Sequence, residues 1–104
     1  MEEQANLEVI MKLIMFGGDA KSNAMEAIRF AKQGEFDQSD QSLAAADASL
    51  LEAHHAQTGL LTQEAQGNPV PVSLLMVHGQ DHLMTSIAFC DLAKEIVELY
   101  KVQK

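Results

Sequence analysis

The segment G67-N-P-V-P71 divides the sequence, because it concentrates residues that interrupt helices. It contains both prolines of the 104-residue chain. Elsewhere Ala, Leu, Met, Glu and Gln dominate, and these residues favour helices. Gln33-Gly34 predicts a second break between helices, because glycine readily adopts the left-handed conformation found just after a helix. The sequence therefore predicts an all-α fold with three long helices.

The expected helices run from about Glu3 to Lys32, from about Glu35 to Gln66, and from Pro71 or Val72 to about Tyr100. Apolar residues recur in each at intervals of three and four. Helices of roughly 30 residues with short links predict an up-down-up antiparallel bundle about 40–45 Å long. Gly17-Gly18 interrupts the first helix, and we interpret the pair as a kink or a close helix contact, since no phosphate-loop motif follows.

The helical periodicity also predicts which residues face the core. The expected stripe of the second helix contains Phe36, Leu43, Ala46, Leu50, Leu51, His54, Thr58 and Leu61. The expected stripe of the third contains Leu75, Met76, Leu83, Ile87, Cys90, Ile96 and Val97. Cys90 lies in an apolar stretch, which favours a buried structural thiol. Leu74 to Val77 form a continuous apolar run, and this surplus of apolar surface on a small bundle favours a homo-oligomer.

Composition narrows the functional class. The formal net charge of −8 at pH 7 disfavours nucleic acid and anionic membrane surfaces and favours a basic protein partner, or serves solubility alone. No apolar run reaches the about 18 residues that a membrane helix needs, and no signal peptide opens the chain. We expect a single domain over residues 1–104, soluble and cytoplasmic, without direct membrane insertion.

Titratable residues cluster in M76-V-H-G-Q-D-H-L-M84, within the third expected helix. His78, Asp81 and His82 stand at i, i+3 and i+4 and therefore share a face. We interpret Gly79 as a position that lets another backbone or a partner approach His78 closely. The sequence leaves open whether the Gln80 side chain reaches this face.

Three interpretations of this cluster compete. The histidines could be structural, satisfied by Asp81 and backbone groups. His78 and His82 could bind zinc, with a third ligand from His54-His55, although the metalloprotease motif is absent because position 79 is Gly. A histidine could instead act as a nucleophile, since neutral imidazole attacks phosphorus readily.

Three motifs carry a resemblance to a known family. They are G18-D-A-K-S22, A53-H-H-A-Q-T-G59 and, above all, M76-V-H-G-Q-D-H-L-M84. With them the chain resembles, end to end, the lactose/cellobiose family of IIA components of the bacterial phosphoenolpyruvate-dependent sugar phosphotransferase system.

The resemblance implies a phosphocarrier that assembles as a nine-helix homotrimer. His78 would accept a phosphoryl group from phosphorylated HPr, as a tele-phosphohistidine, and pass it to the cysteine of a cognate IIB. The sugar, a β-linked disaccharide of the cellobiose, lactose or chitobiose type, would enter through IIC. Gln80 and His82 match positions near the phosphoryl pocket. Asp81, one from each of three subunits, would bind Mg²⁺ or another divalent cation at the trimer axis.

The alternatives from other classes are a non-catalytic zinc-binding bundle and a helical adaptor. The zinc-binding bundle predicts stoichiometric zinc on His78 and His82 without phosphorylation. The adaptor predicts that His78→Ala leaves every partner interaction intact. His54 and His55 have no assigned role.

Overall fold

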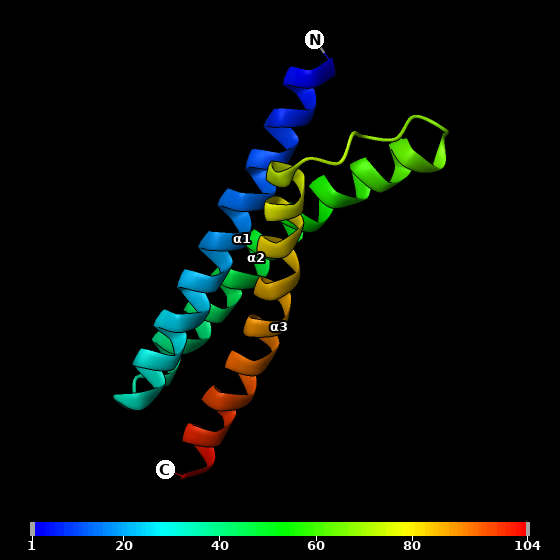
Figure 1. Ribbon diagram of the computed structural model, residues 1–104. Coiled ribbons are helices and arrows are strands. Elements are labelled where there is room, and N and C mark those ends of the chain that lie inside the picture. Colours follow the sequence, from blue (N-terminus) through cyan, green and yellow to red (C-terminus); the bar gives the residue numbers. More distant parts are fainter. Residues whose placement is uncertain (1, 104) are drawn as a thin grey trace.

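The protein is a bundle of three helices, α1 (Glu2–Lys32), α2 (Phe36–Ala65) and α3 (Leu74–Gln103). The computed structural model describes residues 2–103, with side chains from residue 6 onward. The helices run up, down and up, and residues 2–103 contain no strand (Figure 1). The predicted all-α three-helix fold is therefore confirmed. The bundle measures 53 × 20 × 20 Å and exceeds the predicted length because α1 and α3 are staggered along its axis (Figure 1).

The turn between α1 and α2 forms as predicted at Gly34. This residue has φ +77°, a conformation that side chains with a Cβ rarely adopt. Its N–H donates to Ala31 O at 3.0 Å, and the N–H of Glu35 donates to Phe30 O at 2.9 Å. These bonds satisfy carbonyl groups that the end of α1 would leave open.

The predicted start of α3 at Pro71 or Val72 is wrong, because the helix begins at Leu74. Ser73 decides the boundary. Its Oγ accepts a hydrogen bond from the N–H of Met76 at 3.1 Å, which is the geometry of a helix N-cap. A capping hydroxyl prevails here over the tolerance of helices for proline in their first turn.

Small residues let α1 pack closely against both other helices. One core cluster combines alanines of α1 with apolar residues of α2 and α3: Ala20, Ala24, Ala27, Ile28, Ala31, Ala46, Cys90, Ala93 and Val97. A second lies nearer the start of α1: Ile10, Leu13, Ala53, Leu60, Met76 and Leu83. Cys90 is fully buried, as predicted. Among the described residues, no helix has both the length and the hydropathy to cross a bilayer.

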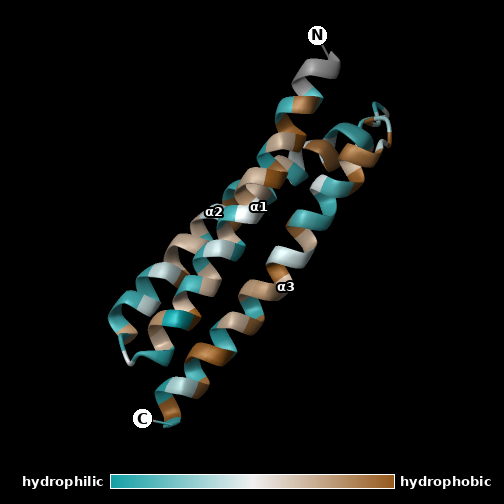
Figure 2. Ribbon diagram, turned by 60° about the vertical axis from the view of Figure 1, so that its left-hand side comes forward, coloured by the Kyte–Doolittle hydropathy of each residue, from teal (hydrophilic) through white to brown (hydrophobic). Residues whose placement is uncertain are grey.

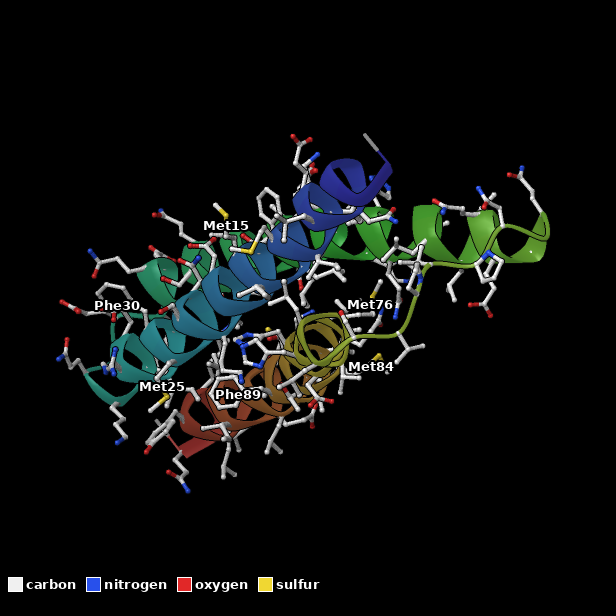
Figure 3. All side chains as sticks on the ribbon, turned by 45° about the horizontal axis from the view of Figure 1, so that its top comes forward. Met15, Met25, Phe30, Met76, Met84 and Phe89 are labelled. Atoms are coloured by element: carbon white, nitrogen blue, oxygen red, sulfur yellow. The ribbon has the colours of Figure 1, made fainter. Side chains whose placement is uncertain are left out.

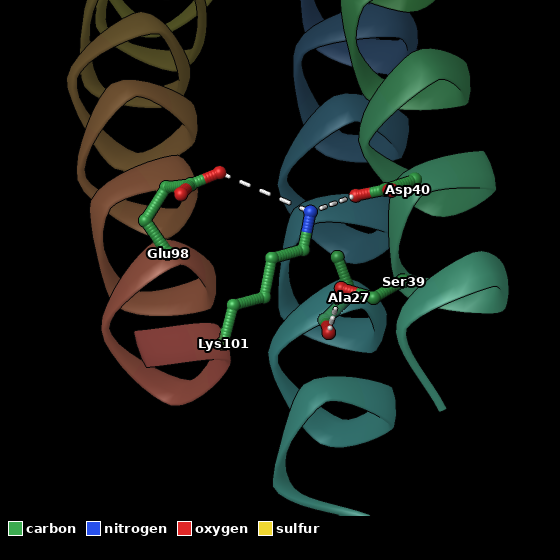
Figure 4. Close-up of polar contacts among 5 residues, drawn as sticks. All are labelled: Ala27, Ser39, Asp40, Glu98 and Lys101. Carbon is green, nitrogen blue, oxygen red and sulfur yellow. Dashed lines mark hydrogen bonds and ion pairs between the residues drawn. The ribbon is translucent and has the colours of Figure 1, made fainter. Parts of the chain in front are cut away.

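The predicted core stripe of α2 is partly wrong. Ala46 is buried as predicted, whereas Leu51, His54, Thr58 and Leu61 are exposed. The buried positions of α2 are instead mostly small: Ser39, Ala46, Ser49, Ala53 and Leu60. Serine can be buried in the core here because its hydroxyl forms a hydrogen bond. Ser39 Oγ donates to Ala27 O at 2.8 Å (Figure 4).

The predicted stripe of α3 holds better. Met76, Leu83, Cys90 and Val97 are buried, Ile87 and Ile96 are partly buried, and Leu75 is exposed. The outer sides of α2 and α3 are joined by ion pairs. Lys101 Nζ lies 2.9 Å from Asp40 Oδ1 and 3.8 Å from Glu98 Oε1 (Figure 4). Lys94 Nζ lies 2.9 Å from Asp47 Oδ1. Such exposed pairs each contribute at most about 1 kcal/mol, so they orient the helices more than they stabilise them.

Gly17 marks the closest approach of α1 to α3, and α1 runs unbroken through it. Ser86 Oγ donates to Gly17 O at 2.7 Å. A Cβ at position 17 would lie 3.0 Å from His82 O, whereas a Cβ at Gly18 would meet nothing within 4 Å. The close helix contact predicted for the pair is thus confirmed at Gly17 alone.

Gly17→Ala is therefore expected to lower the free energy of unfolding by about 1–3 kcal/mol, because the new methyl group meets backbone that cannot easily move. Gly18→Ala is the matched control, and it should raise stability by about 0.5–1 kcal/mol, since alanine favours a helix over glycine. Urea unfolding of both variants measures the difference. Equal effects at the two positions would refute the close contact.

Candidate functional site

His78 and His82 form a contacting pair on one side of α3. Their Nε2 atoms lie 3.2 Å apart. The rings meet edge to face, with centroids 4.5 Å apart and planes at 83°. His78 is exposed, and His82 is partly buried. The face that the i, i+4 spacing predicts is confirmed for these two residues.

The surroundings of His82 favour its neutral form. Burial is the main cause that lowers its pKa from 6.5, and the nearby His78 and Lys21 lower it further, while Asp81 opposes them. Its Nδ1 is buried and lacks a hydrogen-bond partner within the described structure. A protonated ring would place an N–H at that unpaired position, which is unfavourable.

Hydrogen-bond accounting then selects the tautomers of the pair. Two neutral rings in contact through Nε2 need one N–H donor and one lone-pair acceptor. If His78 donated, His82 would carry its proton on the buried Nδ1, where no acceptor exists. If His82 donates from Nε2, that orphan donor disappears. We infer that His82 donates, and that Nε2 of His78 carries a lone pair.

The lowered pKa of His82 gives stability a pH dependence. Because folding lowers this pKa below 6.5, the unfolded chain takes up the proton at a higher pH than the folded chain. The contribution of neutral His82 is complete above pH 6.5 and is lost as the pH falls through the lower folded value. Urea unfolding from about pH 7.5 to about pH 5 should therefore show a loss of stability in the wild type that His82→Gln reduces. Parallel curves for the two proteins would contradict it.

Gln80 points away from His78 within one chain, because residues two apart on a helix differ in direction by about 200°. Its Oε1 accepts a hydrogen bond from Gln57 Nε2 of α2 at 2.8 Å. The two amide nitrogens approach thioether sulfurs, with Gln80 Nε2 4.0 Å from Met76 Sδ and Gln57 Nε2 3.9 Å from Met84 Sδ (Figure 3). Sulfur accepts but does not donate, so both contacts agree with this orientation of the amides. Gln80 thus keeps N–H donors to offer.

Asp81 is exposed on α3, and its backbone carbonyl accepts a hydrogen bond from Thr85 Oγ1 at 2.7 Å. No group of three or more His, Cys, Asp or Glu side chains within the described part of the chain could hold a metal ion. His54 and His55, the third-ligand candidates for zinc, lie exposed on α2. A metal at Asp81 would therefore need carboxylates from further subunits.

The prediction that Gly79 gives a partner access to His78 is wrong. It is buried against α1, where a Cβ would lie 3.3 Å from Ile10 Cγ2 and 3.4 Å from Leu13 Cδ1. The missing side chain lets α1 and α3 pack closely. His78 is accessible because it lies on the outer side of α3, beside a shallow hollow that it lines with Leu74 and Leu75.

Two residues that the sequence reasoning did not assign to the site adjoin it. Gln57 orients Gln80, and Lys21 of α1 reaches Thr85 Oγ1, with its Nζ 3.4 Å away. Both lie in motifs that carry the family resemblance, which is the one signal that could have identified them. Their contacts join positions far apart in the sequence, so spacing along one helix does not reveal them.

An accessible histidine, paired with a second histidine on an all-helical bundle, is typical of a class of protein that transfers a chemical group on imidazole. Comparison with known proteins shows the family. Residues 8–101 match the sequence model of the family described as "PTS system, Lactose/Cellobiose specific IIA subunit". The lactose-specific EIIA component of Streptococcus mutans is 47% identical over 90 residues, which are 86% of each chain.

Two solved structures are similar throughout. The cellobiose-specific enzyme IIA of Bacillus anthracis has a TM-score of 0.92 and 42% identity, over 94% of this chain and 90% of that one. The IIA(chitobiose) chain of an Escherichia coli complex with HPr has a TM-score of 0.82 and 39% identity, over 94% and 95%. The chain belongs to the lactose/cellobiose-specific IIA family and is a component of the sugar phosphotransferase system.

Proposed function

We propose that this protein is a phosphocarrier in which Nε2 of His78 accepts a phosphoryl group from phosphorylated HPr. It then passes the group to the cysteine of a cognate IIB. The observation that carries the proposal is the contact between His78 and His82, which leaves a lone pair on an exposed imidazole nitrogen. The E. coli relative bound to HPr supports the choice of donor.

The chemistry needs little beyond position. The lone pair of His78 Nε2 attacks phosphorus, and the bond between phosphorus and HPr breaks as the new P–N bond forms. The N–H of His82 Nε2, which points at His78, becomes a donor to a phosphoryl oxygen. In the second step the cysteine thiolate of IIB attacks phosphorus, and His78 leaves with its lone pair restored.

The exposed face of α3 supports assembly as a homotrimer. Apolar residues recur there at intervals of three, four or seven, and two exposed carboxylates, Asp81 and Glu95, lie on the same face. The apolar residues together with Asp81 are Leu74, Val77, Asp81, Met84, Ala88, Leu92, Leu99 and Val102. We call these eight residues the outer stripe. The exposed fractions of Leu74 and Val102 exceed 80%, at 86% and 81%, and Figure 2 shows hydrophobic segments along the whole of α3. A heptad-like apolar seam of this kind drives helices to associate.

A trimer built on the outer stripe would also bring Gln80 to the site. His78 follows Val77 and Gln80 precedes Asp81, so the two side chains flank the stripe on opposite sides. In a parallel assembly one flank of each helix meets the other flank of its neighbour. The amide of Gln80, held by Gln57, would then donate to the phosphoryl group on His78 of the next subunit.

Asp81 is the position at which such a trimer would bind a cation. Three carboxylates on one axis repel each other, and a divalent ion such as Mg²⁺ would neutralise them. Oxygen ligands suit this ion, and the exposed carboxylate within an apolar stripe fits the requirement. Its role would be assembly, because Asp81 lies within the outer stripe whereas His78 lies at its flank.

The sugar is proposed only as a class. The three relatives described above are named after lactose, cellobiose and chitobiose, and each of these sugars is a β-linked disaccharide. None of the residues around His78 would touch the sugar, because His78 passes its phosphoryl group to IIB and not to the sugar. We propose a β-linked disaccharide of the lactose, cellobiose or chitobiose type, imported through IIC.

Intact-mass spectrometry after incubation with Enzyme I, HPr and phosphoenolpyruvate tests the proposal. We expect one acid-labile phosphoryl group per chain. It should move to the cognate IIB when the phosphorylated protein is separated from phosphoenolpyruvate and Enzyme I and then mixed with IIB. A reaction without HPr is the control and should leave the mass unchanged. Unmodified protein in the presence of fully phosphorylated HPr would overturn the proposal and favour the zinc-binding bundle.

A further inference from the structure

Lys21 of α1 reaches the column of α3 that carries the histidine pair. Its Nζ lies 3.4 Å from Thr85 Oγ1. Thr85 follows His82 by three residues and His78 by seven, so the three side chains line one side of the helix. The hydroxyl proton of Thr85 is donated to Asp81 O, so its oxygen presents a lone pair to the ammonium group. The contact of Lys21 with Thr85 therefore lies about one helical turn from His82 and about two turns from His78.

The ammonium group of Lys21 lacks the carboxylate partner that three other cations of the protein have. Lys94, Lys101 and Arg29 each bind an acidic side chain at 2.9 Å. Within residues 6–103, no carboxylate forms an ion pair with Lys21, and its recorded bond goes to a neutral hydroxyl. A cation held by a weak neutral acceptor can move to an anion at little cost.

The positive charge of Lys21 acts on the histidine pair. After burial and His78, Lys21 is the next cause that lowers the pKa of His82. The same field would attract a phosphoryl dianion on His78, whose oxygens would project toward His82. Lys12 and Lys32 exert no comparable influence on His82.

Open space lets the Lys21 side chain move. Lys21 lines a shallow hollow with four other residues of α1 and with Phe89 of α3; the four are Gly18, Ser22, Met25 and Arg29. Met25 and Phe89 mark the place where α1 and α3 meet (Figure 3). Gly18 contributes no side chain and a Cβ there would meet nothing within 4 Å, so the surface beside Lys21 is unobstructed.

We propose that Lys21 is a phosphoryl-binding residue, whose ammonium group transfers from Thr85 to the phosphoryl oxygens when His78 is phosphorylated. The inference rests on the phosphocarrier role proposed above. Lys21 makes and breaks no covalent bond. It supplies positive charge to a dianion that is otherwise formed on a chain with net charge −8, and a charge-assisted hydrogen bond is the strong kind.

The test measures the equilibrium constant for phosphoryl transfer from phosphorylated HPr to wild type, Lys21→Met, Lys21→Arg and Lys32→Met. Lys32→Met is the matched control, because it removes the same charge from an exposed position at the far end of α1. The phosphorylated fraction is read by intact mass at several HPr ratios, at low and high salt. Thermal unfolding of the unphosphorylated variants shows whether the fold has changed.

We expect Lys21→Met to lower the equilibrium constant about tenfold, as the loss of one charge-assisted hydrogen bond implies. Lys21→Arg and Lys32→Met should stay within about twofold, and high salt should shrink the deficit of Lys21→Met. If Lys21→Met unfolds, Lys21→Gln replaces it.

An equilibrium constant in Lys21→Met equal to that of wild type or of Lys32→Met would overturn the inference and leave the phosphocarrier role intact. A wild-type protein that takes no phosphoryl group would remove both.

Discussion

His78→Ala is expected to abolish phosphoryl uptake, with no detectable acid-labile phosphate on the chain. The imidazole is the nucleophile, and neither His82 nor any hydroxyl beside it can replace it. His82 has its Nδ1 buried, and with its proton on Nε2 it offers no accessible lone pair to phosphorus. Loss of the attacking group removes the reaction path rather than slowing one step of it. Intact mass after incubation with phosphorylated HPr measures the result.

His54→Ala and His55→Ala are the matched controls for this prediction. Each removes one imidazole from an exposed position on α2 and leaves the pair on α3 unchanged. Both should accept one phosphoryl group per chain, as the wild type does. If His78→Ala is still labelled while one of these controls is not, the carrier residue lies on α2 and the assignment is wrong.

Asp81→Leu is expected to make the proposed trimer more stable, by about 1–4 kcal/mol, because it would replace converging carboxylates with apolar side chains of similar reach. A single polar residue within an apolar seam sets register and oligomeric state at a cost in stability. The variant should also lose any response to divalent cations. Sedimentation equilibrium and thermal unfolding, each with Mg²⁺ and with EDTA, measure both effects.

Glu52→Leu serves as the control for Asp81→Leu, because it removes one carboxylate from an exposed position on α2, outside the outer stripe. It should leave the subunit association constant and its dependence on Mg²⁺ as they are in the wild type. A destabilised or monomeric Asp81→Leu protein would show that the outer stripe does not form the subunit interface.

Much of the fold follows from local signals. Gly34 and the prolines at positions 69 and 71 lie in the breaks between helices, so the number and order of the helices could be predicted. The start of α3 could not, because it depends on which of several possible residues caps the helix, and Ser73 does. Each of these boundaries is decided within a few residues.

The inner face of α2 was harder to predict because hydrophobicity alone misleads there. Ser39 and Ser49 are buried since α1 offers them acceptors, at Ala27 O and Asp19 Oδ2. Those acceptors lie 12 and 30 positions away in the sequence. The large apolar side chains Leu51 and Leu61 are left outside, where a single chain has nothing to cover them.

The candidate site likewise has some contacts that could be predicted from local spacing and others that could not. The contact between His78 and His82 follows from spacing on one helix and could be predicted. The contacts of Lys21 and Gln57 cross between helices, and Gly79 turns out to serve packing against Ile10 and Leu13. Spacing along a helix therefore predicts the histidine pair, whereas the contacts that Lys21 and Gln57 make near it depend on how the helices pack.

The most direct test of the account is long-range ¹H–¹⁵N NMR of the phosphorylated protein, with ³¹P–¹⁵N coupling to identify the modified nitrogen. The account predicts that the phosphoryl group is bonded to Nε2 of His78, and that His82 remains a neutral ring with its proton on Nε2. A phosphoryl group on Nδ1 of His78, or on any other histidine, would contradict it.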